Sequence, residues 1–310
     1  MNTSTMLVIA VLVFMSVLLW LLVKPKRKID LILSISRKLL GFKYETMLID
    51  GYRWHYLDSK GDNKQSIVLL HGFGANKDNW LLYGYYLKKN YRVIMPDLPG
   101  FGDTKKDQTM DYSVASQVKR IDRFVNQLSL EKVHIVGNSM GGLIALQFAL
   151  DYPNYLSSLQ LMNAAGIKSK KSSQLELAVA QKNNPLLVTE FSELDKLLSI
   201  TMHKSIWIPK LFKRDLFNQL SQNYDFYDKI FWALVTEPPL NEELAKIRIP
   251  VLILWGLQDQ LLDVSCAHVL NEKIKHATLI IHDNDGHIPM MESPKKSAIE
   301  YLTFLHKIGS

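Results

Sequence analysis

From residue 44 to the C-terminus, short runs of apolar residues alternate with amphipathic segments. The runs are rich in Val, Ile and Leu, as in strands that are buried on both faces. Such strands are predicted at 66–70, 92–96, 133–137, 156–163, 250–256 and 277–282. Helices are predicted at 77–89, 112–128 and 140–151, and a strand pair at 44–50 and 53–58. This alternation predicts an α/β fold with a mostly parallel sheet and helices on both of its faces.

The stretch from 166 to 248 breaks this alternation. It is rich in Leu, Lys, Phe and Trp, and its pattern is typical of helices. We interpret it as a helical cap that is inserted into an α/β core formed by residues 44–165 and 249–310.

The most apolar segment of the chain lies at the N-terminus, where Ser16 is the only polar residue between Met6 and Val23. About 20 apolar residues are needed to cross a bilayer. A cleaved signal peptide is the alternative, but it would have basic residues before the run and small residues at a cleavage site. Here the basic residues KPKRK follow the run, at 24–28. The pattern therefore favours a transmembrane anchor at 6–23.

Residues 24–43 form a basic juxtamembrane segment after the anchor. Within it, IDLILSISRKLLGF at 29–42 is amphipathic. It is either a helix in the membrane interface or the first helix of the domain, packed on the core. Since the positive residues follow the span, the positive-inside rule predicts a single-pass membrane protein whose domain lies in the cytoplasm.

Charge and cysteine content exclude some classes of protein. The formal net charge is +7, but no nucleic-acid-binding motif accompanies it, and its concentration after the anchor favours lipid as the partner. The single cysteine, Cys266, cannot form an intrachain disulfide. The histidines lack metal-ligand spacing, so neither a metal nor a cofactor is predicted. The sequence does not indicate an oligomeric state.

A polar turn, GNSMGG at 137–142, joins the predicted strand 133–137 to the helix that follows. A serine on such a turn stands clear of the sheet, and its neighbours two positions away must be small. The N-terminus of the helix behind the serine favours negative charge that develops there. Ser139 is therefore the candidate nucleophile.

A serine nucleophile needs a base to take its proton. His287 follows the last predicted strand, and Asp259 follows the strand before it. The order is then Ser139, Asp259, His287, each at the strand ends where sites gather in parallel sheets. Asp259 would orient the imidazole and stabilise its cation. Asp263 is the alternative acid, whereas Asp285 is too near His287 in sequence to reach its Nδ1.

A backbone oxyanion hole is predicted beside the serine. The sequence HGFG at 71–74 follows the strand 66–70, and its glycines allow backbone to approach a substrate. The N–H groups of Phe73 and Met140 are expected to form the hole. We interpret His71 and Asp97 as loop contacts without a role in proton transfer, and Glu292 as a helix-start or loop contact.

Taken together, HGFGANKDNW, PDLPGFGDT, GNSMGG, WGLQDQ and GHIPMMESP resemble the α/β-hydrolase superfamily. The resemblance covers residues 45–308 and, with the N-terminal span, is strongest to membrane-anchored monoacylglycerol lipases and bacterial membrane-bound phospholipases A. It implies that Ser139, Asp259 and His287 form the triad and that Phe73 and Met140 form the oxyanion hole. It also implies a variable helical cap, from which no substrate residue can be transferred.

The resulting hypothesis is a membrane-anchored serine hydrolase that cleaves carboxylic esters of lipids through an acyl-enzyme. Its substrate would be a monoacylglycerol, lysophospholipid or phospholipid. GNSMGG also resembles the C–C bond hydrolases of aromatic degradation, which act on soluble keto acids and lack a membrane span. A non-catalytic, membrane-tethered binding protein is a third alternative, although such a protein would be expected to lack a triad residue.

Overall fold

The computed structural model describes residues 5–6, 24–61, 64–204 and 206–309. The predicted anchor at 6–23 therefore lies outside the described residues, apart from Met6. Within the described ranges, no helix is both long enough and apolar enough to span a membrane.

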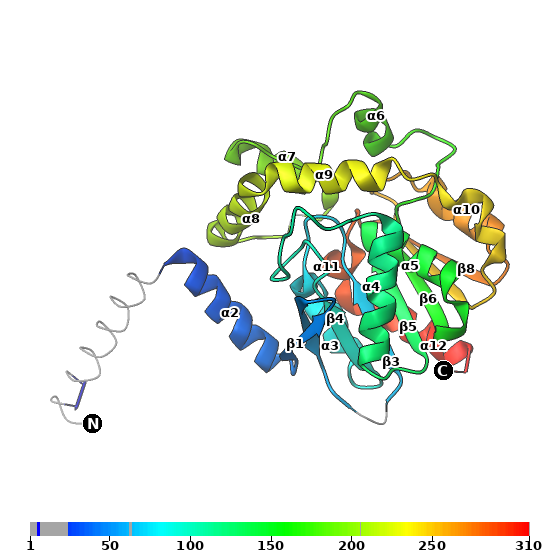
Figure 1. Cartoon of the computed structure of the whole chain (residues 1–310), viewed down its shortest axis with the longest axis horizontal. Helices are drawn as coiled ribbons and strands as arrows, with labels where there is room; N and C mark the ends of the chain where they lie inside the picture. Colours follow the sequence, from blue (N-terminus) through cyan, green and yellow to red (C-terminus); the bar gives the residue numbers. More distant parts are fainter. Residues whose placement is uncertain (1–4, 7–23, 62–63, 205, 310) are drawn as a thin grey trace.

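The core of the fold is a sheet that has eight strands in the described part of the chain, in the order β1-β2-β4-β3-β5-β6-β7-β8 (Figure 1). The strands are β1 (Lys43–Ile49), β2 (Tyr52–Asp58), β3 (Ser66–Leu70), β4 (Arg92–Pro96), β5 (Val133–Asn138), β6 (Leu156–Met162), β7 (Val251–Gly256) and β8 (Ala277–His282). β2 is antiparallel to β1 and β4, and the other neighbours are parallel. The predicted mostly parallel sheet is confirmed.

Helices cover both faces of this sheet. They are α3 (Leu81–Leu87), α4 (Val114–Gln127), α5 (Met140–Asp151), α10 (Ser265–Lys273), α11 (Pro289–Glu292) and α12 (Pro294–Lys307). In β3, Val68 and Leu70 join a hydrophobic cluster with α4 and α5, whereas Ile67 and Leu69 join one with α3 and α12. Alternate residues of a strand point to opposite faces, so a strand with cores on both sides must be apolar throughout.

Two helix boundaries differ from the predicted ones for local reasons. The predicted helix 77–89 begins as a 3₁₀ turn, η1 (Lys77–Trp80), which is capped by the side chain of Asn76 and continues into α3. The predicted helix 112–128 begins two residues later, because the Ser113 hydroxyl accepts a hydrogen bond from the Ser116 N–H and acts as the N-cap.

Residues 25–39, within the segment predicted to be juxtamembrane, form α2 (Pro25–Leu39), which is drawn in dark blue in Figure 1. Pro25 suits the first turn of a helix because its missing N–H would have no intrahelical acceptor. At the other end Gly41 has a φ of +76°, and the N–H groups of Gly41 and Phe42 close the helix on Lys38 and Arg37. α2 packs on the rest of the fold and buries Ile29, which agrees with the second of the two predicted alternatives.

A group of helices lies between β6 and β7, and we call α6 to α9 the cap helices. They are α6 (Gln174–Ala180), α7 (Leu194–Thr201), α8 (Lys210–Gln222) and α9 (Tyr224–Val235). Figure 1 shows them together above the sheet, with α8 nearest to α2. Their position closes one end of the sheet and leaves a cavity beneath them.

Candidate active site

The candidate nucleophile, Ser139, lies between β5 and α5 with a φ of +54°, in the left-handed region that residues with a Cβ rarely adopt. The two positions that flank it, 137 and 141, can hold only glycine. A Cβ on Gly137 would lie 2.2 Å from the carbonyl oxygen of Gly141, and a Cβ on Gly141 would lie 2.2 Å from that of Leu70. The strained turn is held in place by these close backbone approaches, as is typical of functional sites.

His287 and Asp259 are brought together after β8 and β7. The distance from His287 Nδ1 to the nearer carboxylate oxygen of Asp259 is 2.8 Å, and both side chains are almost fully buried. We assign the Nδ1 proton to this hydrogen bond, which leaves Nε2 as the basic nitrogen. The His287 carbonyl accepts a hydrogen bond from the side chain of Asn138, the residue before Ser139, at 3.0 Å. The three predicted residues thus follow β5, β7 and β8 at one end of the sheet, with Ser139 next to a residue that contacts His287.

The carboxylate of Asp259 is fixed by more than His287. Its second oxygen accepts from the N–H groups of Leu261 and Leu262, at 2.8 and 3.0 Å. Asn163, at the end of β6, donates to the oxygen that also contacts His287, at 2.7 Å. These bonds hold the carboxylate in one orientation, so the imidazole has a defined partner.

Sequence reasoning did not find Asn163, although a polar residue directly after a buried strand was a usable signal. It did interpret Glu292 as a helix-start or loop contact, and the observed contacts are of the second kind. The carboxylate of Glu292 accepts from the backbone N–H groups of Gly286, His203 and Lys204. It therefore ties the loop before His287 to the segment that follows α7.

The two other carboxylates considered as the acid lie elsewhere. Asp263 accepts from the Ser265 N–H. Asp285 contacts Lys204 and the imidazole of His282. Burial would raise the pKa of Asp285, but hydrogen bonds from His282 and Lys204 lower it to about 2.

The predicted oxyanion groups face a common space. Phe73 lies in the loop after β3, and Met140 is the first residue of α5. Among the described residues, no acceptor contacts either backbone N–H, so both are available to a ligand. The His71 ring holds the loop after β3 in place. Its Nε2 accepts a hydrogen bond from the Leu98 N–H at 3.0 Å, and its Nδ1 lies 2.8 Å from the Gly72 carbonyl oxygen. Burial lowers the pKa of His71, which keeps this structural contact neutral.

Ser139, Phe73 and Met140 line a cavity of about 310 Å³ beneath the cap helices. Most of the remaining wall is apolar, with Phe231 and Leu234 contributed by α9. A cavity of this size and lining suits an apolar ligand group with one polar end at the serine.

The remaining candidates for chemistry have structural roles. Cys266 is buried at the edge of this cavity, and burial raises the pKa of its thiol to about 12. His134 is buried against the Ser158 hydroxyl, and burial lowers its pKa to about 4. In the described part of the chain, no group of three or more His, Cys, Asp or Glu side chains could hold a metal ion.

A buried ion-pair cluster stands next to the oxyanion loop, and sequence reasoning missed its cation. The ammonium of Lys77 lies 2.7 Å from a carboxylate oxygen of Asp97 and 2.7 Å from one of Asp103. Burial alone would lower the pKa of Lys77, but the neighbouring carboxylates outweigh it and raise the pKa. Asp97 also accepts from the Lys77 backbone N–H, at 2.8 Å. This cluster connects the segment after the oxyanion loop to the loop after β4.

Comparison with known proteins agrees with this geometry. A family model described as the α/β-hydrolase fold matches residues 65–294. Monoacylglycerol lipase abhd6-B of Xenopus laevis is 36% identical over 318 residues, which cover 98% of this chain and 93% of the relative.

Two solved structures are informative. A bacterial membrane phospholipase A superposes with a TM-score of 0.90 and 33% identity, over 99% of both chains. The meta-cleavage product hydrolase CumD of Pseudomonas fluorescens IP01 superposes with a TM-score of 0.74 and 26% identity, over 86% of this chain and 99% of the other. Both shape and sequence are therefore more similar to the phospholipase.

Proposed function

The chain belongs to the α/β-hydrolase family and is a carboxylic ester hydrolase, and from this premise we propose that it cleaves lipid esters through an acyl-enzyme. The substrate class is a monoacylglycerol, lysophospholipid or phospholipid. One observation carries the proposal: the buried Asp259–His287 pair adjoins a strained serine at the wall of an apolar cavity.

In the proposed mechanism, His287 Nε2 takes the proton of Ser139 as the hydroxyl oxygen attacks the acyl carbonyl. The imidazolium then protonates the leaving glycerol or lysolipid oxygen, and the ester bond breaks to give the acyl-enzyme. Water, activated by the same nitrogen, attacks the acyl-enzyme and releases the fatty acid. Asp259 stabilises the imidazolium and keeps the ring oriented, without itself being protonated.

The oxyanion that forms in each step is proposed to accept hydrogen bonds from the N–H groups of Phe73 and Met140. Preorganised donors of this kind stabilise the transition state because they need not reorient as charge develops. The availability of both N–H groups supports this assignment.

The surroundings of Ser139 favour an acyl chain over the soluble keto acid of a C–C bond hydrolase. A dienoate acid carries a carboxylate that needs a polar partner, whereas the wall formed by α9 is apolar and Lys168, the basic residue of the cavity lining, is exposed to solvent. The names of the relatives, monoacylglycerol lipase and membrane phospholipase A, point to lipid esters as well.

We further propose that residues 6–23 anchor the protein in a membrane as a single pass. Residues 24–43 would form the juxtamembrane helix, 44–165 and 249–310 the hydrolase core, and 166–248 the cap. The basic residues after the span support a cytoplasmic location of the core.

Fatty acid release by the detergent-solubilised full chain tests this function. The substrates are monoacylglycerols, lysophospholipids and diacylphospholipids. Ser139→Ala should abolish release, and Ser199→Ala, the same change on the exposed surface of α7, should not. If the folded wild-type protein releases no fatty acid from any of these lipids, the proposal is wrong.

A further inference from the structure

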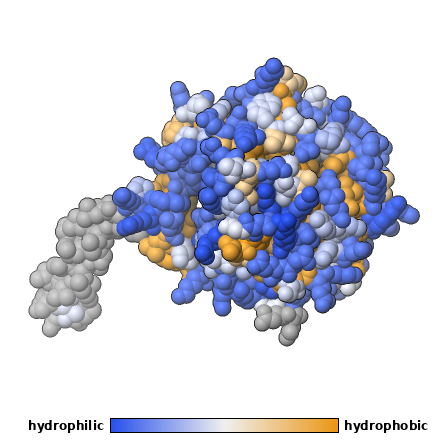
Figure 2. All heavy atoms as spheres, viewed as in Figure 1, coloured by the Kyte–Doolittle hydropathy of each residue, from blue (hydrophilic) through white to orange (hydrophobic). Residues whose placement is uncertain are grey.

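The juxtamembrane helix α2 has two apolar sides, and only one of them is used within the fold. Ile29 is buried against the fold, whereas Leu31, Ile35 and Leu39 are 48%, 51% and 80% exposed. These three residues are spaced by four and therefore form one stripe along the helix. Figure 2 shows hydrophobic side chains on the side of the molecule where Figure 1 places α2.

α3 also exposes apolar side chains. Leu82 and Tyr85 are exposed, and they lie three residues apart on one side of that helix. The Lys88 ammonium lies over the rings of both Tyr85 and Phe42, so α3 adjoins the chain just after α2. We call Leu31, Ile35, Leu39, Leu82 and Tyr85 the α2–α3 face.

We propose that the α2–α3 face lies in the interface of a lipid bilayer and sets the orientation of the hydrolase core on the membrane. The proposal rests on the membrane anchor of the proposed function and goes beyond it. An anchor alone would tether the hydrolase core to the membrane, whereas this face would also determine which side of the core contacts the lipid.

The short distance along the chain between the apolar run and α2 indicates that lipid covers the α2–α3 face. α2 begins at Pro25, two residues after the apolar run at 6–23. A helix rises about 1.5 Å per residue, so Ile35 lies only about 15 Å along α2 from Pro25. A helix that leaves a bilayer with an apolar side exposed is expected to lie along the interface, because that side is then removed from water.

The charges near the face suit anionic headgroups. Lys24, Arg27, Lys38, Lys43 and Lys89 are exposed around α2 and α3. Each basic group near a negatively charged leaflet is attracted to it over about a Debye length. The face therefore combines an apolar centre with a basic margin.

Ion pairs at both ends of α2 make the helix part of the core instead of a free linker. Near its N-terminus the Lys26 ammonium lies 3.7 Å from the Asp215 carboxylate of α8. Near its C-terminus Arg37 donates two hydrogen bonds to Asp78 of η1, at 2.7 and 2.5 Å, and both side chains are largely buried. Because α2 cannot turn on the core without breaking these contacts, insertion of its stripe would orient the whole core.

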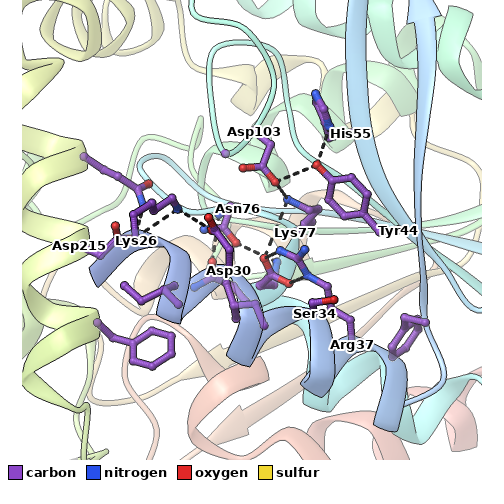
Figure 3. Close-up of a pocket in the computed structure, with 18 of the residues that line it drawn as sticks. Lys26, Asp30, Ser34, Arg37, Tyr44, His55, Asn76, Lys77, Asp103 and Asp215 are labelled. Atoms are coloured by element: carbon purple, nitrogen blue, oxygen red, sulfur yellow. Dashed lines mark hydrogen bonds and ion pairs between the residues drawn. The ribbon is translucent and has the colours of Figure 1, made fainter. Parts of the chain in front are cut away.

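A second, larger cavity of about 1290 Å³ adjoins α2 (Figure 3). α2 forms one wall with Lys26, Asp30 and Arg37, and the labelled Lys77 and Asp103 lie across from it. The cavity lies between α2, α8 and η1, which begins four residues after Phe73. In the proposed orientation, this space would lie beside the lipid surface.

The test measures the depth of single labelled positions in the full chain. Ile35→Cys and Leu177→Cys are matched, since both residues are helical and about half exposed, and α6 lies far from α2 in Figure 1. The native Cys266 is buried and does not compete for the label. Each variant carries an environment-sensitive fluorophore and is reconstituted into vesicles of phosphatidylcholine and phosphatidylglycerol. Lipids with a quencher on the acyl chain report contact with the bilayer.

We expect the label at position 35 to be quenched about twofold or more, and the label at 177 to be unaffected. Equal quenching at both positions, or none at 35, would overturn the proposal. Concentration-dependent self-quenching at 35 without lipid quenching would also overturn it, because a second copy would then cover the face. Fatty acid release is measured on the same vesicles, so a failure of the proposed function is seen separately from a failure of docking.

Discussion

Removal of the Lys77 ammonium should cost far more stability than the loss of a surface charge. The side chains of Lys77 and Asp97 are 1% and 0% exposed, so Lys77→Met leaves a carboxylate in the interior without its cation. Breaking a buried pair in this way costs about 3–5 kcal/mol. Asp97 keeps the N–H groups of Lys77 and Asp103 as donors, which places the expected loss near the lower end of that range.

The coupling between the two side chains is measured with a double-mutant cycle. The free energy of unfolding is obtained from denaturant titrations of the wild type, Lys77→Met, Asp97→Asn and the double variant. Because Asn carries no charge, the double variant should be less destabilised than the sum of the single variants. Single-variant effects that are additive within about 0.5 kcal/mol would refute a strong buried pair.

Because of Asp103, the contribution of this cluster to the stability of the fold should decrease at acid pH. Burial would raise its pKa, but the charge and hydrogen bond of Lys77 lower it from 3.8 to about 2. The folded-state pKa is depressed, so the stabilisation is present above pH 3.8 and is lost as the pH falls toward 2. The effect is modest because the Asp103 side chain is 44% exposed. Lys77→Met should reduce this loss, which unfolding curves at neutral and acid pH would show.

Three further predictions concern the candidate site. Ser139→Ala should abolish fatty acid release and leave the melting temperature nearly unchanged, whereas Ser139→Cys should keep reaction with acyl-directed probes. Asp259→Asn should lower kcat by about 10⁴-fold, by analogy with loss of the triad aspartate; a larger loss in Asp263→Asn would show that Asp263 is the acid. Gly141→Ala should prevent stable folding, because the new Cβ would lie 2.2 Å from a carbonyl oxygen, and a soluble variant with a normal melting temperature would contradict this.

Features that depend on neighbouring residues were predictable from the sequence. The strands at 66–70, 92–96 and 277–282 have the predicted bounds. For the first two, which are buried inside the sheet, the reason is that strands with cores on both faces are continuous apolar runs. The turn around Ser139 was predictable in part for a local reason, since Gly137 approaches the backbone of Gly141 only four residues away, whereas the approach of Gly141 to Leu70 depends on the tertiary fold. The family resemblance was confirmed by the comparisons.

Other predictions stay open. The membrane span at 6–23 lies outside the described residues, and the roles of Ser139, Asp259, His287, Phe73 and Met140 await the experiments above. What the structure adds is their proximity, which separations of many residues along the chain do not reveal. The two alternatives for 29–42 are also compatible, because α2 packs on the core with one side and exposes a second apolar side.

By itself the sequence determined the sheet, the strained serine turn and the order of the candidate triad, because sterics and hydrophobic periodicity act over a few residues. Only the tertiary structure decided which groups support that site. Asn163 reaches Asp259 across 96 residues, and Arg37 reaches Asp78 across 41. Such contacts depend on how whole elements pack, and a hydrogen bond between distant residues has no periodic signature in the chain.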